Sequence, residues 1–500
     1  MKNPYHDEAP VDAIRIGRVG VILSIIGFLL VILIPAFSVV SHFPKIKVRE
    51  ESVKSLPLFE GWRKTDGVLL RWAGYTGNQR VFSGRDGWLY YRSDLDAVYG
   101  KGPYHAEPAS VAREKREHPW QAPVPLVKEF SRLLSDRGIR LILVPVPTKP
   151  MVCREGLGLS SFAGTSPFWR EFIDDLGSSG IEAIDLFPLF ASVPTGEERF
   201  LKQDTHWTPK MMETVAKEVA SRCRSNRSRS AAGSQELREM ERESYGDLVE
   251  MLDLGATPDG FSPETVTLRQ VAESAEEAPN SRVVVLGDSF VNIFEDPALG
   301  FGREGETSLR SGFSSHLSHS LGEKVHTIAI NGGGATAVRE AFVHLPEAQR
   351  KAAKVVVWVL SSRDILLPEI PAERAGIEWR SVAFPDSGPT REPVIGGETE
   401  VVATLREVSS IEDPAQTPYA SAIYSALFVE EGEKAVEHFV FLWAFRDRKL
   451  EATASLEPGR RYRLRLLPLS ESPVASRATR IDDLFRVDLP PSFAVGVEAE

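Results

Sequence analysis

The sequence predicts an α/β fold built on a parallel β-sheet, with an apolar segment near the N-terminus and a small all-β domain at the C-terminus. Residues 283–286 are apolar and mostly β-branched, which is typical of a strand buried on both faces of a parallel sheet. Apolar runs at 139–146 and 354–360 alternate with segments of helical spacing, and this alternation favours a doubly wound sheet. From residue 377 onward, strand patterns occur without a competing helical period.

Composition narrows the class of protein. The chain has 500 residues, of which 42% are hydrophobic and 26% charged, and this length suffices for two or three globular domains. A net charge of -11 and the lack of a long basic run argue against a nucleic-acid partner. No segment resembles a nucleotide or acetyl-CoA loop, and the spacing of Cys153 and Cys223 does not suit metal binding, so we expect no cofactor and no metal. Whether these cysteines form a disulfide stays open.

The N-terminal region contains a candidate membrane anchor. Residues 19–40 carry no charge and are long enough to span the hydrocarbon core of a bilayer, and membrane helices tolerate a proline such as Pro35. Cleavable signal peptides have shorter apolar cores, so an uncleaved transmembrane helix is expected. Basic residues flank the segment on both sides, and flanking charge therefore does not decide its orientation.

The expected division of the chain has four parts. These are the N-terminus with the anchor at 1–44, a stalk and the start of the catalytic region at 45–120, a catalytic domain at 121–375, and a β-rich accessory domain at 376–500. Within the catalytic domain, residues 224–280 are dense in Ser, Arg and Glu, which predicts a mobile surface insertion. A role of this insertion in polymer binding is a second interpretation.

The remaining elements follow from local patterns. A long loop is expected at 99–125, and Gly138 closes the helix that precedes the first strand of the sheet. Thr208 and Pro209 have the residue types of a helix N-cap and first turn. The other expected helices are 126–136, 167–176, 209–219 and 335–344, and the other expected strands are 182–187, 325–330, 400–408, 422–429, 437–445 and 461–466. The C-terminal strands suit either a sandwich or an OB-like barrel, with Trp443 and Tyr462 as core or sugar-binding aromatics.

Ser289 is the candidate nucleophile. It follows the apolar strand after Gly287 and Asp288, and a sharp turn there lifts a serine above the carboxyl edge of the sheet. Gly287 permits the tight backbone, and the amides of Ser289 and Phe290 are expected to face a developing oxyanion. A serine hydroxyl is a poor nucleophile at neutral pH, so this interpretation requires a histidine and a carboxylate.

Asp204 and His206 are the expected partners. They are two residues apart, so in an extended loop their side chains point the same way, directly before the helix that Thr208 caps. Two further groups follow strand ends. Asn331 precedes a run of glycines and offers an amide donor to an oxyanion, and Arg363 is positioned either to bind a carboxylated sugar or to pair with an acid.

Five stretches together resemble the SGNH-hydrolase-like domain of the alginate O-acetyltransferase family (the AlgJ/AlgX type). They are 82–90 (FSGRDGWLY), 144–149 (VPVPTK), 204–208 (DTHWT), 287–290 (GDSF) and 356–364 (VVWVLSSRD). Their order matches that of the family, in which Asp and His precede Ser, whereas ordinary GDSL enzymes have the reverse order. The Ser361-Ser362 pair is a departure, because acidic residues are common at that point in the family.

The resemblance implies an SGNH-like (flavodoxin-like) parallel sheet with circularly reordered motifs and a Ser289-His206-Asp204 triad. Gly287 and Asn331 would form the oxyanion hole, and Lys149, Trp207 and Arg363 are the expected substrate-binding residues. It further implies a single-pass protein of the bacterial inner membrane with a short cytoplasmic N-terminus and a periplasmic catalytic domain. This domain would acetylate an exopolysaccharide with acetyl groups supplied by a membrane-bound O-acyltransferase.

Two other functions fit the same residues. A carbohydrate O-acetylesterase would use the identical triad, because water and a sugar hydroxyl compete for one acyl-enzyme. A non-catalytic glycan-binding scaffold would carry the triad as a remnant. The expected membrane tether favours transfer, since a secreted esterase needs none.

Overall fold

The computed structural model describes residues 80–99, 123–157, 167–193, 198–224, 237–252, 261–272, 278–303, 305–366, 379–384, 398–411, 414, 419, 421–430, 435–469, 472, 478–482, 484, 486 and 489–500. The expected anchor at 19–40 and nearly all of the expected stalk lie outside these residues. Within the described ranges, no helix combines the length and apolarity needed to cross a bilayer.

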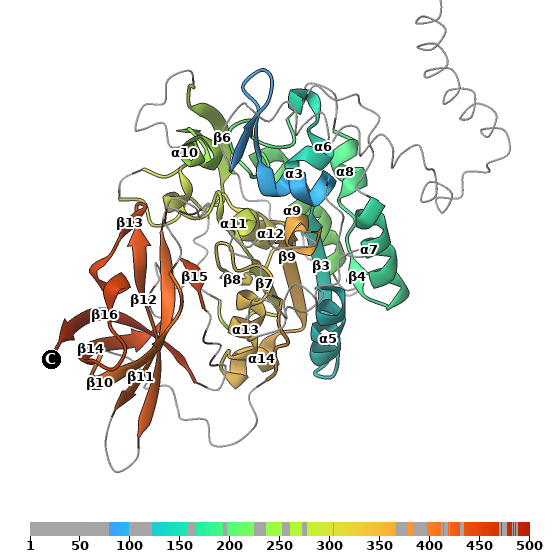
Figure 1. Ribbon diagram of the computed structural model, residues 1–500. Coiled ribbons are helices and arrows are strands. Elements are labelled where there is room, and N and C mark those ends of the chain that lie inside the picture. The colour runs from blue at the N-terminus through green and yellow to red at the C-terminus, as the bar shows by residue number, and fades with distance from the viewer. Residues whose placement is uncertain are drawn as a thin grey trace, which may run out of the picture. The chain divides into compact units, whose positions relative to one another are not determined.

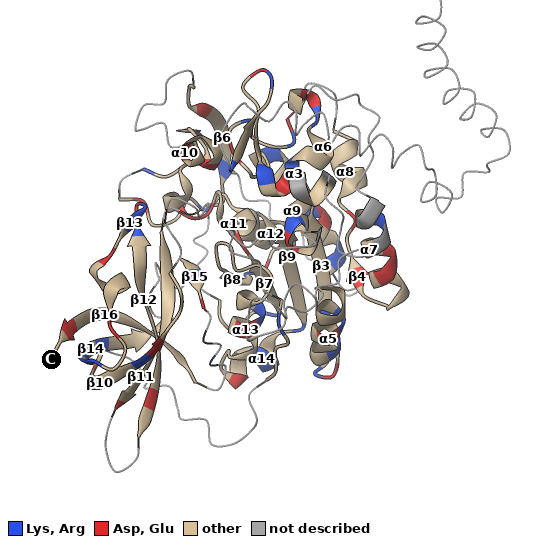
Figure 2. Cartoon of the chain, in the orientation of Figure 1, with Lys and Arg blue, Asp and Glu red and all other residues tan. Residues whose placement is uncertain are grey.

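A parallel five-stranded sheet forms the centre of the catalytic region (Figure 1). Its strand order is β4-β3-β9-β7-β8. The strands are β3 (Arg140–Val146), β4 (Glu182–Ala183), β7 (Val283–Gly287), β8 (His326–Ala329) and β9 (Val355–Ser361). Every residue of β7 and β9 is buried, and both strands are free of charged residues in Figure 2. The predicted parallel α/β sheet is therefore confirmed, although β4 is much shorter than the expected strand 182–187.

Helices cover both faces of this sheet. Alternate residues of each strand point to opposite faces, and because both sets are apolar, both faces have to be covered. Val283, Val285 and Val357 face the apolar sides of α9 (Pro209–Cys223) and α12 (Phe313–Leu321). Val284 and Trp358 face α5 (Pro123–Ser135), α7 (Pro167–Ser178) and α13 (Ala337–Val343). The result is a three-layer sandwich, in which side chains at the carboxyl edge of the sheet are left for ligands.

Short elements gather around that edge. The β1–β2 hairpin (Val81–Ser83 and Leu89–Tyr91) turns at Asp86 and Gly87, both at positive φ. The other short elements there are α3 (Arg92–Tyr99), α6 (Lys149–Val152), η3 (Glu155–Leu157), α8 (Phe187–Ala191), α11 (Ser289–Asn292), η4 (Pro297–Leu299) and α15 (Ser362–Leu366). The short helix α14 (Glu347–Ala352) lies at the opposite edge of the sheet, directly before β9.

The expectation of a mobile surface insertion at 224–280 was wrong for the part of it that the structure describes. Two antiparallel strands, β5 (Arg238–Ser244) and β6 (Glu264–Gln270), flank the short helix α10 (Asp247–Met251). Buried Val266 and Leu268 of β6 pack into the catalytic core. A salt bridge from Arg269 to the buried Glu213 ties β6 to α9. These strands contain few apolar residues among many charged ones, so their sequence did not predict the hairpin.

The C-terminal region is all β, as predicted. It contains β10 (Thr399–Val408), β11 (Ala422–Glu430), β12 (Val436–Arg446), β13 (Lys449–Leu450), η5 (Ala452–Ser455), β14 (Arg461–Pro468), β15 (Thr479–Ile481) and β16 (Pro491–Ala499). The sheet closes on itself, because β12 pairs with β16, β16 with β14, β14 with β10, β10 with β11 and β11 with β12. This closure selects a barrel over the sandwich.

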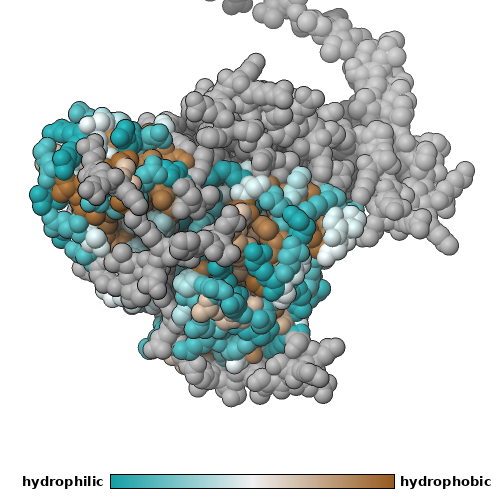
Figure 3. Space-filling view, turned by 90° about the horizontal axis from the view of Figure 1, so that it is seen from below, coloured by the Kyte–Doolittle hydropathy of each residue, from teal (hydrophilic) through white to brown (hydrophobic). Residues whose placement is uncertain are grey.

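Aromatic residues of the barrel contribute to its packing. Tyr462 is 3% exposed, and its hydroxyl accepts a hydrogen bond from the amide of Glu457. Trp443 is half-buried against the edge of Phe493. Apolar residues reach the surface over this part of the molecule, at the left of Figure 3. Leu450 of β13 is exposed to 62%. Tyr462 therefore belongs to the core, and sugar binding by Trp443 stays a prediction.

Candidate active site

Ser289 lies at the first position of α11, directly beyond the carboxyl end of β7. Asp288 caps this short helix, because its Oδ1 accepts the amide hydrogen of Phe290 at 2.9 Å. Gly287 has to be glycine for a packing reason: a Cβ there would lie 2.3 Å from Cγ2 of Val291. The strand, the missing side chain and the cap together aim the Ser289 hydroxyl away from the sheet.

The loop before α9 brings His206 to this hydroxyl. Thr208 caps α9 as predicted, with its Oγ1 accepting the Met211 amide at 3.3 Å. An isolated bridge between Phe200 and Trp207 fixes the base of the loop. The imidazole then packs against Phe290 with 4.9 Å between ring centroids. Two segments that are 83 residues apart are thus brought together at one edge of the sheet.

The three expected catalytic residues form one hydrogen-bonded line. Nε2 of His206 lies 2.8 Å from Oγ of Ser289, and Nδ1 lies 2.6 Å from Oδ1 of Asp204. The same Oδ1 accepts the backbone amide of His206 at 2.9 Å, which fixes the carboxylate relative to the ring. With Nδ1 donating to Asp204, Nε2 carries the lone pair that a general base needs.

Burial and charge act in opposite directions on this pair. Burial by itself raises the pKa of Asp204, but the charge and hydrogen bond of His206 hold that pKa below its ordinary value. Burial lowers the pKa of His206, but Asp204, with the charges of Asp247 and Asp288, more than compensates, so the pKa of His206 lies above its ordinary value. The imidazolium formed during proton transfer is therefore stabilised inside the site.

Two groups have a hydrogen-bond donor left for the expected oxyanion. The Phe290 amide, expected to be such a donor, instead donates to Asp288. The Ser289 amide has no acceptor among the described residues, as is usual at the start of a helix. Oδ1 of Asn331 accepts from Nδ2 of Asn292 at 2.9 Å, so its own NH2 group is the end left to donate to a ligand. The carbonyl of Gly287 accepts from the Ile330 amide, and its oxyanion role stays a prediction.

The glycines after Asn331 make room for protein atoms. A Cβ on Gly332, which has φ of 72°, would lie 2.8 Å from the ring of Tyr419. A Cβ on Gly334 would lie 2.9 Å from Oδ2 of Asp288. These glycines therefore let the turn approach two side chains near the nucleophile.

Lys149 holds the catalytic loop by hydrogen bonds to backbone carbonyls. Its side chain is fully buried, and its Nζ donates to the carbonyls of Leu89, Lys202 and Asp204 at 2.6, 2.7 and 3.0 Å. Its ammonium lies 5.2 Å from the ring centre of Trp88. Burial lowers the pKa of Lys149 to about 8. All three donors are used by carbonyls, so this geometry does not favour its expected role in substrate binding.

Arg363 pairs with an acid, one of its two expected roles. Its Nη1 lies 2.7 Å from Oδ1 of Asp94 on α3, and 15% of its side chain is exposed. Burial raises the pKa of Asp94 and Asp288 in spite of this guanidinium, and it raises the pKa of Asp364 to about 7. Binding of a carboxylated sugar by Arg363 stays a prediction.

Trp207 lies in the core beneath the site. It is fully buried, stacks on Phe313 with 6.0 Å between ring centroids, and meets Phe290 edge to face. This placement supports the loop that carries His206 and does not favour contact with a substrate. Cys153 and Cys223 are both buried and unpaired with each other.

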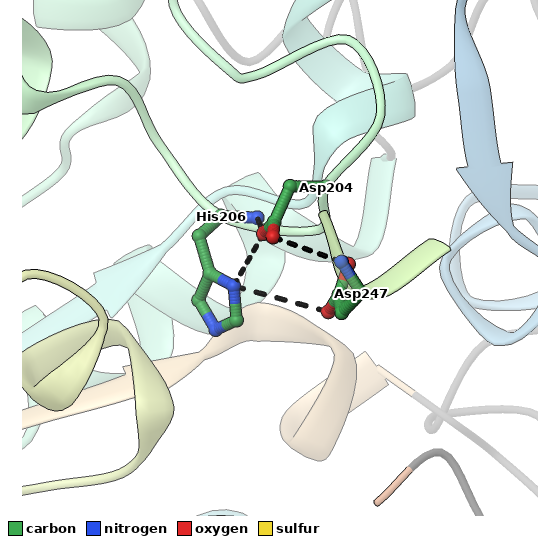
Figure 4. Close-up of side chains that lie close together, drawn as sticks. All are labelled: Asp204, His206 and Asp247. Atoms are coloured by element: carbon green, nitrogen blue, oxygen red, sulfur yellow. Dashed lines mark hydrogen bonds and ion pairs between the residues drawn. The ribbon is translucent and has the colours of Figure 1, made fainter. Parts of the chain in front are cut away.

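Sequence patterns did not reveal the acids of the β5–β6 hairpin that hold the catalytic loop. Glu264 accepts the amides of Lys202 and Gln203 at 2.7 and 2.9 Å. Asp247 lies beside Asp204 and His206, and both carboxylates are on the Nδ1 side of the imidazole (Figure 4). A glycine before Asp247 in a charged segment was the only available signal. A cation among these three groups would displace the bond between His206 and Asp204.

Comparison with known proteins agrees with this geometry. Residues 81–362 match the family described as "ALGX: SGNH hydrolase-like domain, acetyltransferase AlgX". The chain belongs to this family of SGNH-like O-acetyltransferases. The matched segment includes the three residues of the triad and ends before the barrel.

Several relatives and solved structures are similar to this acetyltransferase. "Probable alginate O-acetylase AlgJ" of Pseudomonas aeruginosa is 24% identical over 307 residues, which cover 60% of this chain and 73% of the relative. AlgJ of Pseudomonas fluorescens is 24% identical over 291 residues, covering 57% and 68%. The O-acetyltransferase domain of Pseudomonas putida AlgJ aligns with TM-score 0.42 at 22% identity, over 57% of this chain and 91% of that structure. Pseudomonas aeruginosa AlgX aligns with TM-score 0.41 at 15% identity, over 74% and 84%.

Proposed function

We propose that this acetyltransferase transfers acetyl groups to hydroxyls of an exopolysaccharide through an acetyl-Ser289 intermediate. The observation that carries the proposal is the continuous line from Ser289 Oγ to His206 and Asp204, at 2.8 and 2.6 Å. General-base activation of a serine requires this contact distance and an oriented imidazole.

In the first step, Nε2 of His206 takes the proton of Ser289 as Oγ attacks the carbonyl carbon of an acetyl donor. The negative charge that develops on the carbonyl oxygen is bound by the Ser289 amide and the NH2 group of Asn331. The tetrahedral intermediate then expels the leaving group, which receives the proton from His206. Acetyl-Ser289 remains, and Asp204 keeps the ring in the same tautomer throughout.

In the second step, a sugar hydroxyl attacks acetyl-Ser289 while Nε2 of His206 takes its proton. The bond between the acetyl carbon and Oγ breaks, and Oγ recovers a proton from the imidazolium. An acetylated polysaccharide is released, and the enzyme returns to its starting state. The same residues serve both half-reactions, so the site needs no further acid or base.

Further support for this setting comes from the Pseudomonas relatives, which are named as probable alginate O-acetylases. We extend the proposal to a bacterial inner-membrane protein anchored by residues 19–40, with its catalytic domain in the periplasm. A membrane-bound O-acyltransferase would supply acetyl groups to it. An alginate-like exopolysaccharide is the expected acceptor.

The test measures acetyl transfer by the full-length chain in detergent, with a chromogenic acetyl ester as donor and oligosaccharide acceptors. Acetylated sugar detected by mass supports transfer, and release of acetate alone in the presence of acceptors would favour the esterase. Ser289→Ala and His206→Ala should each remove nearly all activity, and the double variant should lose little more, because the residues act as one unit. A folded Ser289→Ala variant with the wild-type rate would overturn the mechanism.

A further inference from the structure

We propose that Asp247 is a positioning residue of this acetyltransferase, which holds Asp204 and the His206 loop and adds a second negative charge beside the imidazole. This inference rests on the proposed function of Ser289 and His206. It assigns a catalytic purpose to the β5–β6 hairpin, which carries Asp247 at the start of α10.

Asp247 bonds to the catalytic loop through its backbone and both carboxylate oxygens. Its amide donates to Oδ2 of Asp204 at 3.0 Å. Its Oδ1 accepts the amide of Thr205 at 2.8 Å, and its Oδ2 accepts the hydroxyl of Thr205 at 2.5 Å. Both carboxylate oxygens of Asp247 thus hold Thr205, the residue between Asp204 and His206, and the backbone amide of Asp247 holds Asp204 itself.

The two oxygens of Asp204 are thus divided between two tasks. Oδ1 takes Nδ1 of His206, and Oδ2 takes the amide of Asp247. A carboxylate with both oxygens bonded cannot rotate to offer His206 a different lone pair. The orientation of the imidazole therefore depends on α10, although Asp247 is 43 residues from Asp204 in the chain.

The carboxylate of Asp247 also acts on His206 by charge. Its Oδ2 lies 3.9 Å from Nδ1 of His206, beyond a direct hydrogen bond but close enough for a strong electrostatic interaction. The other charged groups that face His206 are Asp204 on the same loop, Asp288 before α11 and Asp94 on α3. Asp247 is the acid among them that the hairpin contributes. Burial and the charge of Asp204 raise the pKa of Asp247 to about 7, so its negative charge stabilises the imidazolium of His206 at and above that pH.

The close approach of the hairpin is built into its backbone. Gly246 has φ of 75°, and a Cβ there would lie 2.4 Å from the carbonyl oxygen of Gln203. The amide of Leu248, two residues further on, donates to this same carbonyl at 3.2 Å. On the other side of the hairpin, Glu264 accepts the amides of Lys202 and Gln203. The hairpin therefore grips residues 202–205 at several consecutive points.

The decisive variant is Asp247→Asn, which keeps the shape of the side chain and one acceptor but removes the charge. Loss of an opposite charge at this range should lower the pKa of His206 by about one unit or more. The acid limb of the pH profile of kcat/KM should move to lower pH, and kcat at the optimum should fall roughly tenfold, the factor that one pKa unit represents. KM for the acetyl donor should change little.

The matched control is Glu250→Gln, which removes an exposed acid from the same short helix. Both variants and the wild type are assayed as full-length protein in detergent from pH 5 to 9, with circular dichroism to establish folding. An acid limb that moves in Asp247→Asn but not in Glu250→Gln supports the proposal. A folded Asp247→Asn variant with the wild-type acid limb and rate would overturn it.

A second measurement decides the matter if Asp247→Asn does not fold. In wild-type protein labelled with 15N-histidine, the His206 signals, assigned by their loss in His206→Gln, should titrate with two inflections, one from the ring and one from Asp247. A single inflection would refute the proposal. This titration needs no turnover, whereas failure of the proposed function would show as missing Ser289-dependent activity in the wild type, so the two failures are distinguishable.

Discussion

The amide of Asn331 lies at the turn after β8 with its oxygen fixed by Asn292 of α11. This bond determines which end of the amide is left for a ligand, because Nδ2 of Asn292 can only donate and so selects Oδ1. The NH2 group that remains has the chemistry needed to bind the charge on an acetyl oxygen during attack by Ser289. Its contribution should then appear in the transition state and not in ground-state binding.

Asn331→Ala should therefore lower kcat on the order of 10²-fold, the usual loss for one oxyanion donor, with little change in KM. Asn331→Asp should be at least as impaired, since a carboxylate repels the developing charge. The measurement is steady-state kinetics with a chromogenic acetyl ester. A kcat within twofold of the wild type in Asn331→Ala would show that the oxyanion is held by other donors.

The ammonium of Lys149 connects the hairpin strand β2 to the catalytic loop through three carbonyl groups. Lys149→Met keeps much of the apolar stem but leaves these buried acceptors without their donor. We expect the free energy of unfolding to fall on the order of 3 kcal/mol, because hydrogen bonds to a charged donor are among the strong ones. Urea denaturation measures this change.

The control for that variant is Lys202→Met, since the Lys202 side chain is 39% exposed and pairs with Glu198 on the surface. It should change stability by less than about 1 kcal/mol. Equal destabilisation by both substitutions would show that the buried carbonyls find other partners, and that Lys149 does not hold the loop.

At the residue level, the sequence predicted the triad but misjudged its surroundings. Ser289 and His206 were found because each adjoins a strand end or a helix cap that has a local pattern. The expected substrate contacts of Lys149 and Trp207 are not favoured. Lys149 is held by carbonyls such as that of Leu89, 60 positions away in the chain, and Trp207 packs on the distant Phe313. A motif indicates that a residue matters, but it does not tell whether the residue contacts the substrate or supports the catalytic loop.

At the element level, the β5–β6 hairpin holds the loop that carries His206, the proposed general base. The hairpin can approach because Gly246 lacks a side chain, and Gly246→Ala introduces both a strained φ and a 2.4 Å contact with Gln203. We expect kcat to fall more than tenfold, since displacement of Asp247 frees Asp204 and Thr205. Gly180→Ala is the matched control, because Gly180 has φ of 74° and open space around its Cβ position.

Both substitutions should lower the melting temperature, since alanine is strained at positive φ. Only Gly246→Ala should lower kcat, measured at a temperature where both variants are folded. Parallel losses of kcat in the two variants would indicate a general effect of stability, and the hairpin would then have no specific hold on the loop.

Elements with a strong period were predicted within a few residues, and elements without one were missed. The helix at α9 and the strands β7 and β9 have long apolar patterns, so their existence follows from the sequence. The strand β5 has the sequence REMERES, and only one of its side chains is buried. Pairing with β6 supplies its stability, and no local pattern records that pairing.

At the scale of the whole molecule, closure of the C-terminal barrel could not be read from the chain. The strand β16, at residues 491–499, was not among the expected strands. It pairs in parallel with β12 and antiparallel with β14, and these two contacts convert an open sheet into a ring. Sequence alternation predicts strands, but it does not state which strand of a distant segment will be the neighbour.

Buried acids in the catalytic region lower its stability at neutral pH. Arg363 is the guanidinium beside three buried carboxyl groups, those of Asp94, Asp288 and Asp364. Burial raises the pKa of Asp364 from 3.8 to about 7, because the charge of Arg363, which lowers this pKa, is opposed by the charges of Asp288 and Asp94. The native state therefore binds a proton at Asp364 that the unfolded chain releases.

The sign of the pH dependence follows from this difference. A group whose pKa is raised in the folded state stabilises the fold fully below its unfolded pKa, and this contribution is lost as pH rises through the folded pKa. For Asp364 the window runs from about pH 4 to about pH 7, and its contribution over that window is roughly 4 kcal/mol. Asp364→Asn mimics the protonated acid and should remove this part of the pH dependence.

We therefore expect Asp364→Asn to match the wild type in stability near pH 4 and to become progressively more stable than the wild type up to pH 8. Urea denaturation across this range measures the difference, with the exposed Asp136→Asn as a control that should keep a constant offset from the wild type. If the Asp364→Asn curve runs parallel to that of the wild type, Asp364 is not protonated in the native state at neutral pH. The buried acids would then be compensated by Arg363 more completely than its 3.8 Å separation from Asp364 indicates.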